Sequence, residues 1–249
     1  MPRSLYVPMY PLPDTLPEGT IPMLDGDIEG THPAFHKLHK GSTKNVPSCS
    51  GQARVLFLLE GCAVFTQAGQ DLLLSEKGSY IPDPQKDLTI AAQEGASILE
   101  IAWELTAADQ AALARHTPDY PVVQLYDQCP RYTEPFKSDR TISRTIVRHG
   151  ILPRFSMGSN EAGANDRIDL NCHPAIDQYF FSFPENDVDL LIEADRLPFK
   201  GNTLVHIPLG CYHGVEIGAG QRMHYLWIDL IVNEEAGLAY LDTVHQPLG

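Results

Sequence analysis

Short apolar segments separated by glycine- and proline-rich turns recur along most of this 249-residue chain. A first set lies at residues 55–59, 63–65, 72–74, 88–90 and 98–103. A second set lies at residues 141–147, 179–183, 189–192, 204–207 and 225–228. Short strands at a spacing of roughly 8–12 residues, with turns of this kind between them, are typical of β-barrels and β-sandwiches. The chain is therefore predicted to be all-β.

The two sets of strands resemble each other, because residues 54–59 can be aligned on residues 178–183. A duplicated β domain is the simplest account of this similarity. We therefore expect two tandem jelly-roll β-barrels, an architecture that includes the cupins. The expected domains are residues 1–125, which begin with an extended arm over residues 1–48, and residues 126–249.

One segment is predicted to be helical. Thr106 and Asp109 form the start of an N-terminal cap, residues 107–115 are rich in alanine, and Pro118 follows. Residues 116–131 contain three prolines and are expected to form a linker. The sequence thus predicts one short helix between the two barrels.

Charge and segment hydropathy exclude several classes of partner. The formal net charge is −14, which repels polyanions, so nucleic acid is not an expected partner. No apolar segment approaches the ~20 residues that cross a bilayer, and we expect no membrane association. The N-terminus carries no secretory signal pattern. The five cysteines are an odd, widely spaced set, which favours free thiols in the cytoplasm.

Two histidines in the second repeat are the main candidates for a functional site. His213 ends a turn at residues 208–213 that contains proline and glycine, and this turn can bring it beside His173. Asn171 and His173 point to the same face of an extended segment, because side chains alternate along a strand. Gln178 begins the strand that follows.

The chemistry of these four residues leaves two interpretations open. Neutral imidazoles are common ligands of zinc, iron, nickel and manganese, whereas amide oxygens are weaker, uncharged ligands. The residues could form a catalytic metal centre with open positions for substrate. They could equally be hydrogen-bonded histidines around a small-molecule pocket without metal.

The first repeat lacks the same set of residues. Its equivalent positions hold Cys49, Arg54 and Asp87, which cannot form the same site. The N-terminal barrel is therefore expected to be structural, although Arg54 could contact an anion. Three histidines of the arm are expected to be exposed: His32, His36 and His39.

The second half also resembles a known family, the 5-keto-4-deoxyuronate isomerases (4-deoxy-L-threo-5-hexosulose-uronate ketol-isomerases). These are bicupins of pectin-derived uronate breakdown. The similarity runs through residues 138–142, 155–158, 171–173, 178–181, 208–214 and 226–227, with a looser match at residues 58–61 and 78–82.

In that family, a His-x-His pair, a glutamate five residues later and a further histidine bind a divalent metal, usually zinc. The resemblance implies that His173 is the second histidine and His213 the last. Asn171 replaces the first histidine, and Gln178 replaces the glutamate. The implied metal, which is Zn, Mn, Fe or Ni, would therefore be held by His173, Gln178, His213 and Asn171.

The resemblance implies an isomerase that acts on a small sugar-derived keto acid of the uronate class. A metal would polarise the substrate carbonyl, and an acid/base group would relay a proton between neighbouring carbons. The candidates for this group are Tyr225, His206 and Glu216. The candidates for binding the substrate carboxylate are Arg144 and Arg140.

Two other functions fit the same residues. One is a non-catalytic or regulatory cupin that binds sugar acids through an incomplete metal site. The other is a different metal-dependent cupin enzyme, such as a hydrolase, lyase or dioxygenase. The resemblance also suggests a homo-oligomer, either a dimer or a hexamer, and exposed barrel edges favour such association.

Overall fold

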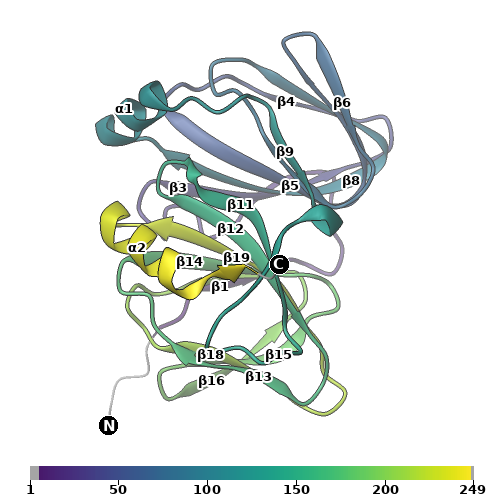
Figure 1. Ribbon diagram of the computed structural model, residues 1–249. Helices are drawn as coiled ribbons and strands as arrows, with labels where there is room; N and C mark the ends of the chain where they lie inside the picture. The colour runs from purple at the N-terminus through teal and green to yellow at the C-terminus, as the bar shows by residue number, and fades with distance from the viewer. Residues whose placement is uncertain (1–5, 248–249) are drawn as a thin grey trace. The chain divides into compact units, whose positions relative to one another are not determined.

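The computed structural model describes residues 6–247 and divides the chain into two compact β units (Figure 1). One unit is Pro13–Cys129, and the other combines the segment that ends at Leu12 with the chain from Pro130 onward. The expected boundary between residues 125 and 126 is thus displaced by four residues. The N-terminal segment also belongs to the other unit, because the strand β1 (Met9–Pro11) pairs with β17 (Thr203–Ile207).

The first unit is an eight-stranded sheet that curls into a barrel around its own core. Its strand order is β2-β3-β8-β5-β7-β9, with β4 paired to β8 and β6 paired to β5. Its elements are β2 (Gly19–Pro22), β3 (Thr31–Leu38), β4 (Thr43–Val46), β5 (Gln52–Gln67), β6 (Gln70–Leu74), β7 (Gly78–Ile81), β8 (Leu88–Glu104), α1 (Ala107–Arg115), β9 (Val122–Leu125) and the 3-10 turn η1 (Tyr126–Gln128).

The two longest strands of this unit, β5 and β8, bend where their pairing shifts register. Gly61 lies at one shift with a positive φ of 91°, and a Cβ there would lie 2.0 Å from the carbonyl oxygen of Gly95. Only glycine fits at such a close approach of two backbones. Leu56 and Phe65 lie on either side of this bend in β5, and both belong to the same apolar core.

The predicted helix is confirmed as α1. The hydroxyl of Thr106 accepts from the backbone N–H of Asp109, and the Asp109 carboxylate accepts from the backbone N–H of Thr106. This reciprocal capping box satisfies two N–H groups that a helix start otherwise leaves unpaired.

The second unit packs two antiparallel sheets face to face. The larger has the order β1-β17-β14-β19-β12-β11-β10-β20, and the smaller has the order β13-β18-β15-β16. The remaining strands are β10 (Arg131–Thr133), β11 (Ile142–Leu152), β12 (Phe155–Ala162), β13 (Asp166–Asn171), β14 (Ile176–Ser182), β15 (Asp187–Ile192), β16 (Asp195–Lys200), β18 (His213–Ile217), β19 (Met223–Ile231) and β20 (Gln246–Pro247). Alternating apolar residues from both sheets fill the space between them.

A second helix, α2 (Glu234–Val244), was not expected from the sequence. Asn233 caps its first turn by accepting from the backbone N–H of Ala236. The helix packs on β14 and β19 through Leu241, with Gly237 close to Ile231 and Ile176 (Figure 1). No helix in the described part of the chain is long and apolar enough to cross a membrane.

Candidate functional site

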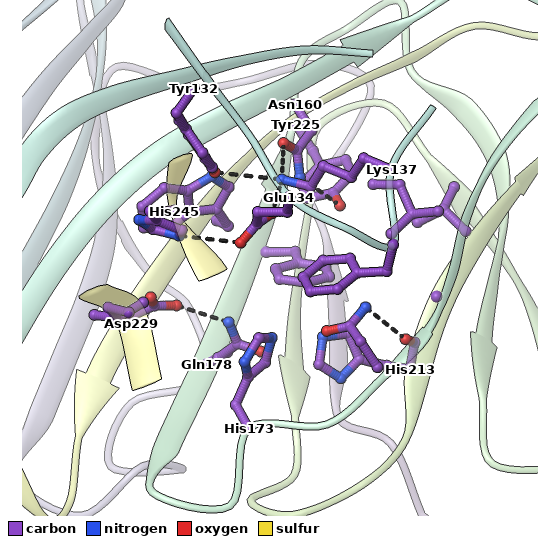
Figure 2. Close-up of a pocket in the computed structure, with 18 residues that line it drawn as sticks. Tyr132, Glu134, Lys137, Asn160, His173, Gln178, His213, Tyr225, Asp229 and His245 are labelled. Atoms are coloured by element: carbon purple, nitrogen blue, oxygen red, sulfur yellow. Dashed lines mark hydrogen bonds and ion pairs between the residues drawn. The ribbon is translucent and has the colours of Figure 1, made fainter. Parts of the chain in front are cut away.

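Two strand ends, one strand and one turn of the second unit bring the predicted residues to one cavity. Asn171 ends β13, His213 begins β18, and the two residues are paired across the smaller sheet. Gln178 lies on β14 of the larger sheet, and His173 lies in the turn between β13 and β14. All four line the same buried cavity (Figure 2). The sequence therefore identified side chains that the fold brings together.

The two imidazoles face each other inside this cavity. The ring centroids of His173 and His213 are 5.1 Å apart. Nδ1 of His213 lies 3.2 Å from the carbonyl oxygen of Cys211, which leaves its Nε2 for the cavity. Burial lowers the pKa of His173 to about 3, with a further contribution from His213, and burial lowers the pKa of His213 to about 4. Both rings are therefore neutral at neutral pH, which is the form that binds metals.

Two polar atoms at the site are buried without a hydrogen-bond partner among the described residues, namely Oδ1 of Asn171, an acceptor, and Nδ1 of His173. The amide nitrogen of Asn171 is engaged, because it donates to the carbonyl oxygens of Asp169 and His213. Burying an unsatisfied polar atom costs about 1–3 kcal/mol. Such atoms in a folded protein point to a partner that the protein chain itself does not supply.

Gln178 is held from behind by a carboxylate. Its amide nitrogen donates to Asp229 over 2.7 Å, and the other carboxylate oxygen of Asp229 accepts from the hydroxyl of Ser156. Burial raises the pKa of Asp229 to about 6, even though the Gln178 hydrogen bond lowers it. This contact fixes the amide so that its oxygen is the atom free to face a ligand.

A buried ion pair that the sequence did not reveal closes another side of the cavity. Lys137 and Glu134, both in the loop between β10 and β11, form a salt bridge with side chains 4% and 5% exposed. Burial would raise the pKa of Glu134, but Lys137 and His245 lower it to about 2. Nε2 of His245 lies 3.1 Å from the second carboxylate oxygen of Glu134 (Figure 2).

Tyr225, the expected proton donor, also lines the cavity. Its ring stacks on Phe180, and its hydroxyl accepts from the amide nitrogen of Asn160. Burial raises the pKa of this phenol, so it carries its proton at neutral pH.

The C-terminal helix and the residues after it complete the wall. Leu241 of α2 and His245 line the cavity, and Tyr240 packs edge-on against His173 at 4.9 Å. The centre of a water molecule can move within a volume of ≈ 30 Å³ inside this cavity. About 10–15 Å³ holds one water molecule by this measure, so the cavity as folded has room for a few atoms only.

The structure places the other two acid/base candidates outside the cavity. His206 is hydrogen-bonded to Asp177 at 2.7 Å and packs against Tyr179, because its position on β17 points it to the other face of the sheet. Glu216 is about half exposed and pairs with Arg196 on the outer surface of the smaller sheet.

Neither arginine expected to bind a carboxylate lies at the cavity. Arg144 pairs with Glu161 at 3.1 Å, and Arg140 is exposed and bonded to the carbonyl oxygen of Asn165. The cation at the cavity is instead Lys137.

The first unit has a polar cluster of its own inside its barrel. Glu100 accepts from Arg54 at 2.8 Å through one oxygen and lies 2.6 Å from Nε2 of His36 through the other. His36 is 1% exposed, so the expectation of an exposed arm histidine is wrong; it lies on β3, a central strand. His32 and His39, by contrast, have side chains 39% and 61% exposed. Asp87 is remote from the cluster and accepts from the backbone N–H of Ser48.

The donor types at the second-unit cavity fit a divalent metal, but weakly. Two neutral imidazoles and two amide oxygens are available, and Oδ1 of Asn171 and Nδ1 of His173 have no hydrogen-bond partner within residues 6–247. Within the described residues, no group of three or more His, Cys, Asp or Glu side chains is arranged to hold a metal ion. Without a charged ligand the strongest short-range attraction is missing. Asp229 offsets part of this loss by polarising the Gln178 amide.

Comparison with known proteins finds likeness in structure alone. No family model and no curated protein sequence matches the chain. Among solved structures, a putative glyoxylate-induced protein from Pseudomonas aeruginosa superposes with a TM-score of 0.73 at 14% identity, over 86% of this chain and 80% of that one. A formate complex of Lactobacillus farciminis oxalate decarboxylase gives 0.71 at 10% identity, over 92% and 88%.

A mutant of Bacillus subtilis oxalate decarboxylase gives a TM-score of 0.69 at 12% identity, over 92% of this chain and 78% of that one. Another structure of the Bacillus enzyme is described by its Mn(II) centres. At identities this low the likeness shows the fold, not the activity. The predicted architecture is confirmed: the chain has the fold of the bicupins, two tandem jelly-roll barrels.

Proposed function

We propose that the second barrel binds a divalent metal ion and a small carboxylic or keto acid, and that it acts on this acid as a metal-dependent enzyme. The observation that carries the proposal is the convergence of His173, His213, Asn171 and Gln178 on one cavity, with two buried polar atoms that have no hydrogen-bond partner among the residues described. The four side chains would hold the ion. When bound, the ion would act as a Lewis acid on a substrate oxygen.

The protein's own residues supply the remaining chemistry. Tyr225 offers a phenolic proton to a developing oxyanion, and its raised pKa keeps that proton in place until it is needed. Lys137 is the cation nearest the cavity, but Glu134 balances its charge, so a bound metal ion would supply the net positive charge that an anionic substrate requires. Leu241 and His245 exclude bulk water from the cavity.

The size of the cavity favours a small acid over a hexose-derived one. A volume of ≈ 30 Å³ holds about two or three water-sized groups, which is closer to the size of a small acid than to that of a six-carbon acid. The ketol-isomerase of sugar-derived keto acids stays the second enzymatic candidate, and it requires α2 to move away so that six carbons can enter. A non-catalytic binding protein is favoured by one observation, which is the lack of a charged ligand among the four donors.

Metal titration tests the proposal directly. After chelation, Mn(II) or Zn(II) is added to the purified protein, and the heat of binding and the rise in Tm are measured. His213→Ala should abolish both effects. His206→Ala is the matched control, because this histidine is paired with Asp177 on the other face of the sheet. Equal binding by wild type and His213→Ala would refute the metal site.

Turnover separates the candidate reactions. The metal-loaded protein is incubated with oxalate, glyoxylate and 5-keto-4-deoxyuronate, and substrate loss and product are followed by NMR. Loss of a two- or three-carbon acid supports the small-acid enzyme, and isomerisation of the uronate supports the ketol-isomerase. Metal and acid binding without any turnover supports the binding protein. Light scattering on the same sample measures whether the protein forms the predicted dimer or hexamer.

A further inference from the structure

The orientation of the Asn160 side chain is fixed by its neighbours. Its amide oxygen accepts from Nζ of Lys137 at 2.8 Å and from the hydroxyl of Ser143 at 2.9 Å. An ammonium group has donors and no acceptor, so it must face the oxygen of an amide and not the nitrogen. Glu134 keeps Lys137 in the ammonium form by pairing with it inside the protein.

This orientation determines the direction of the next hydrogen bond. With its oxygen on Lys137, Asn160 presents its NH₂ group to Tyr225, and the phenolic oxygen accepts over 3.0 Å. The hydroxyl proton of Tyr225 is then not used in this contact. The Tyr225 ring packs against the apolar rings of Phe180 and Phe199, and the Glu134 carboxylate acts on the Tyr225 hydroxyl electrostatically without a hydrogen bond to it. The proton is therefore free to point into the cavity, which Tyr225 lines (Figure 2).

We propose that Lys137, Ser143 and Asn160 are positioning residues that force Tyr225 to act as a hydrogen-bond donor toward the cavity. The site then selects ligands that present an acceptor oxygen at this point, such as a carboxylate or carbonyl oxygen, over ligands that present a hydroxyl or amine proton. The ligand class rests on the proposed function of the same cavity. The direction of the hydrogen bonds among Lys137, Asn160 and Tyr225 does not rest on the proposed function, because it is a property of the protein alone.

The polarity can be measured without ligand or metal. The Raman doublet of tyrosine depends on whether the phenolic oxygen accepts or donates a hydrogen bond. A difference spectrum between wild type and Tyr225→Phe isolates this one side chain. We expect the intensity pattern of an acceptor. The pattern of a donor would overturn the proposal even if no other variant folds.

Asn160→Asp reverses the polarity with almost no change in size. The carboxylate still accepts from Lys137 and Ser143, but it cannot donate, so Tyr225 must now donate to it. The doublet, measured against Asn160→Asp/Tyr225→Phe, should change to the donor pattern. An unchanged doublet would contradict the proposed role of Asn160. Near-UV circular dichroism serves as the control for packing.

Ligand binding provides a separate readout. With Mn(II)-loaded protein and oxalate as the probe, Tyr225→Phe should weaken binding about tenfold, which is the effect of one hydrogen bond. Asn160→Asp should weaken oxalate binding strongly when Tyr225 is present and clearly less in the Tyr225→Phe background. Equal effects in both backgrounds would mean that the added charge alone repels the probe, and would overturn the positioning role. If oxalate does not bind and the doublet has the acceptor pattern, the small-acid function fails and the hydrogen-bond polarity stands.

Discussion

The candidate residues of the second barrel differ from the polar cluster of the first in how their buried polar atoms are paired. In the first barrel, the carboxylate of Glu100 pairs with Arg54 and His36, so the charges satisfy one another. In the second barrel, Oδ1 of Asn171 and Nδ1 of His173 are buried without a hydrogen-bond partner in the described part of the chain. A barrel interior thus tolerates polar residues in either state, but only the second state leaves bonding capacity for a ligand. The difference identifies which copy of a duplicated domain is suited to bind something.

Aligned positions make this contrast specific. The alignment of residues 54–59 on residues 178–183 predicts that Arg54 and Gln178 occupy equivalent places in their barrels. Arg54 pairs with the buried carboxylate of Glu100. Gln178 donates from its amide nitrogen to Asp229, and its amide oxygen is available to a ligand. Unsatisfied groups lower stability, and proteins retain such groups where function requires them.

The largest expected effect is in the first barrel. Glu100→Ala leaves a buried arginine without its partner, and breaking a buried ion pair costs about 3–5 kcal/mol in the free energy of unfolding. Urea denaturation can be followed in each barrel separately, because Trp103 lies in the first and Trp227 in the second. The Trp103 transition should shift to lower urea. Glu104→Ala, at the exposed end of β8, is the matched control, and an equal shift there would break the comparison.

Acid should weaken the second barrel through Glu134. The folded pKa of about 2 lies below the ordinary value of 4.5, so ionised Glu134 stabilises the fold at pH above 4.5. This contribution is lost as the pH falls from 4.5 toward 2, and the shift corresponds to about 3 kcal/mol. The Trp227 urea transition should show the loss. The urea transition of Glu134→Gln should depend less on pH between 4.5 and 2. The same pH dependence in the variant and the wild type would contradict the role given to Glu134.

The smallest effect should have the opposite sign. His173→Phe removes a buried unsatisfied nitrogen, so without metal the free energy of unfolding should stay unchanged or rise by about 1 kcal/mol. Mn(II) should then stabilise the wild type and not the variant. In the first barrel, Arg54→Met should lower stability in either condition. A destabilised His173→Phe in metal-free buffer would show that this histidine has a structural role.

The periodic parts of the fold could be predicted from sequence, and the isolated polar residues could not. Strand spacing revealed both barrels, and the capping box at Thr106 revealed α1, because each is a local pattern. The turn before His213 likewise predicted its convergence with Asn171, whereas His173 reaches the cavity from the turn after β13 and not by alternation along an extended segment. Helix α2 was missed, since nothing in its sequence was recognised as a helix start.

Side chains that meet only in the folded chain leave no local pattern. Lys137 and Glu134 pair within one connecting loop that has no periodic pattern, and His245 reaches Glu134 only through the long-range pairing of β10 with β20. His206 was a candidate acid/base group, but its side chain lies outside the cavity. Its distance along the sequence from the turn does not determine the face of the sheet on which it lies. The register of β17 on β14 determines that face.

The pairing of β1 with β17 has a consequence for how the protein is made. Met9–Pro11 precedes the first barrel in the chain, yet its partner strand follows only after the whole first barrel has been synthesised. The second barrel can therefore finish its larger sheet only late in translation. A fragment that begins at the linker would expose the edge of β17, and an exposed edge strand invites aggregation. Supplying residues 6–12 as a separate peptide should improve the solubility of such a fragment.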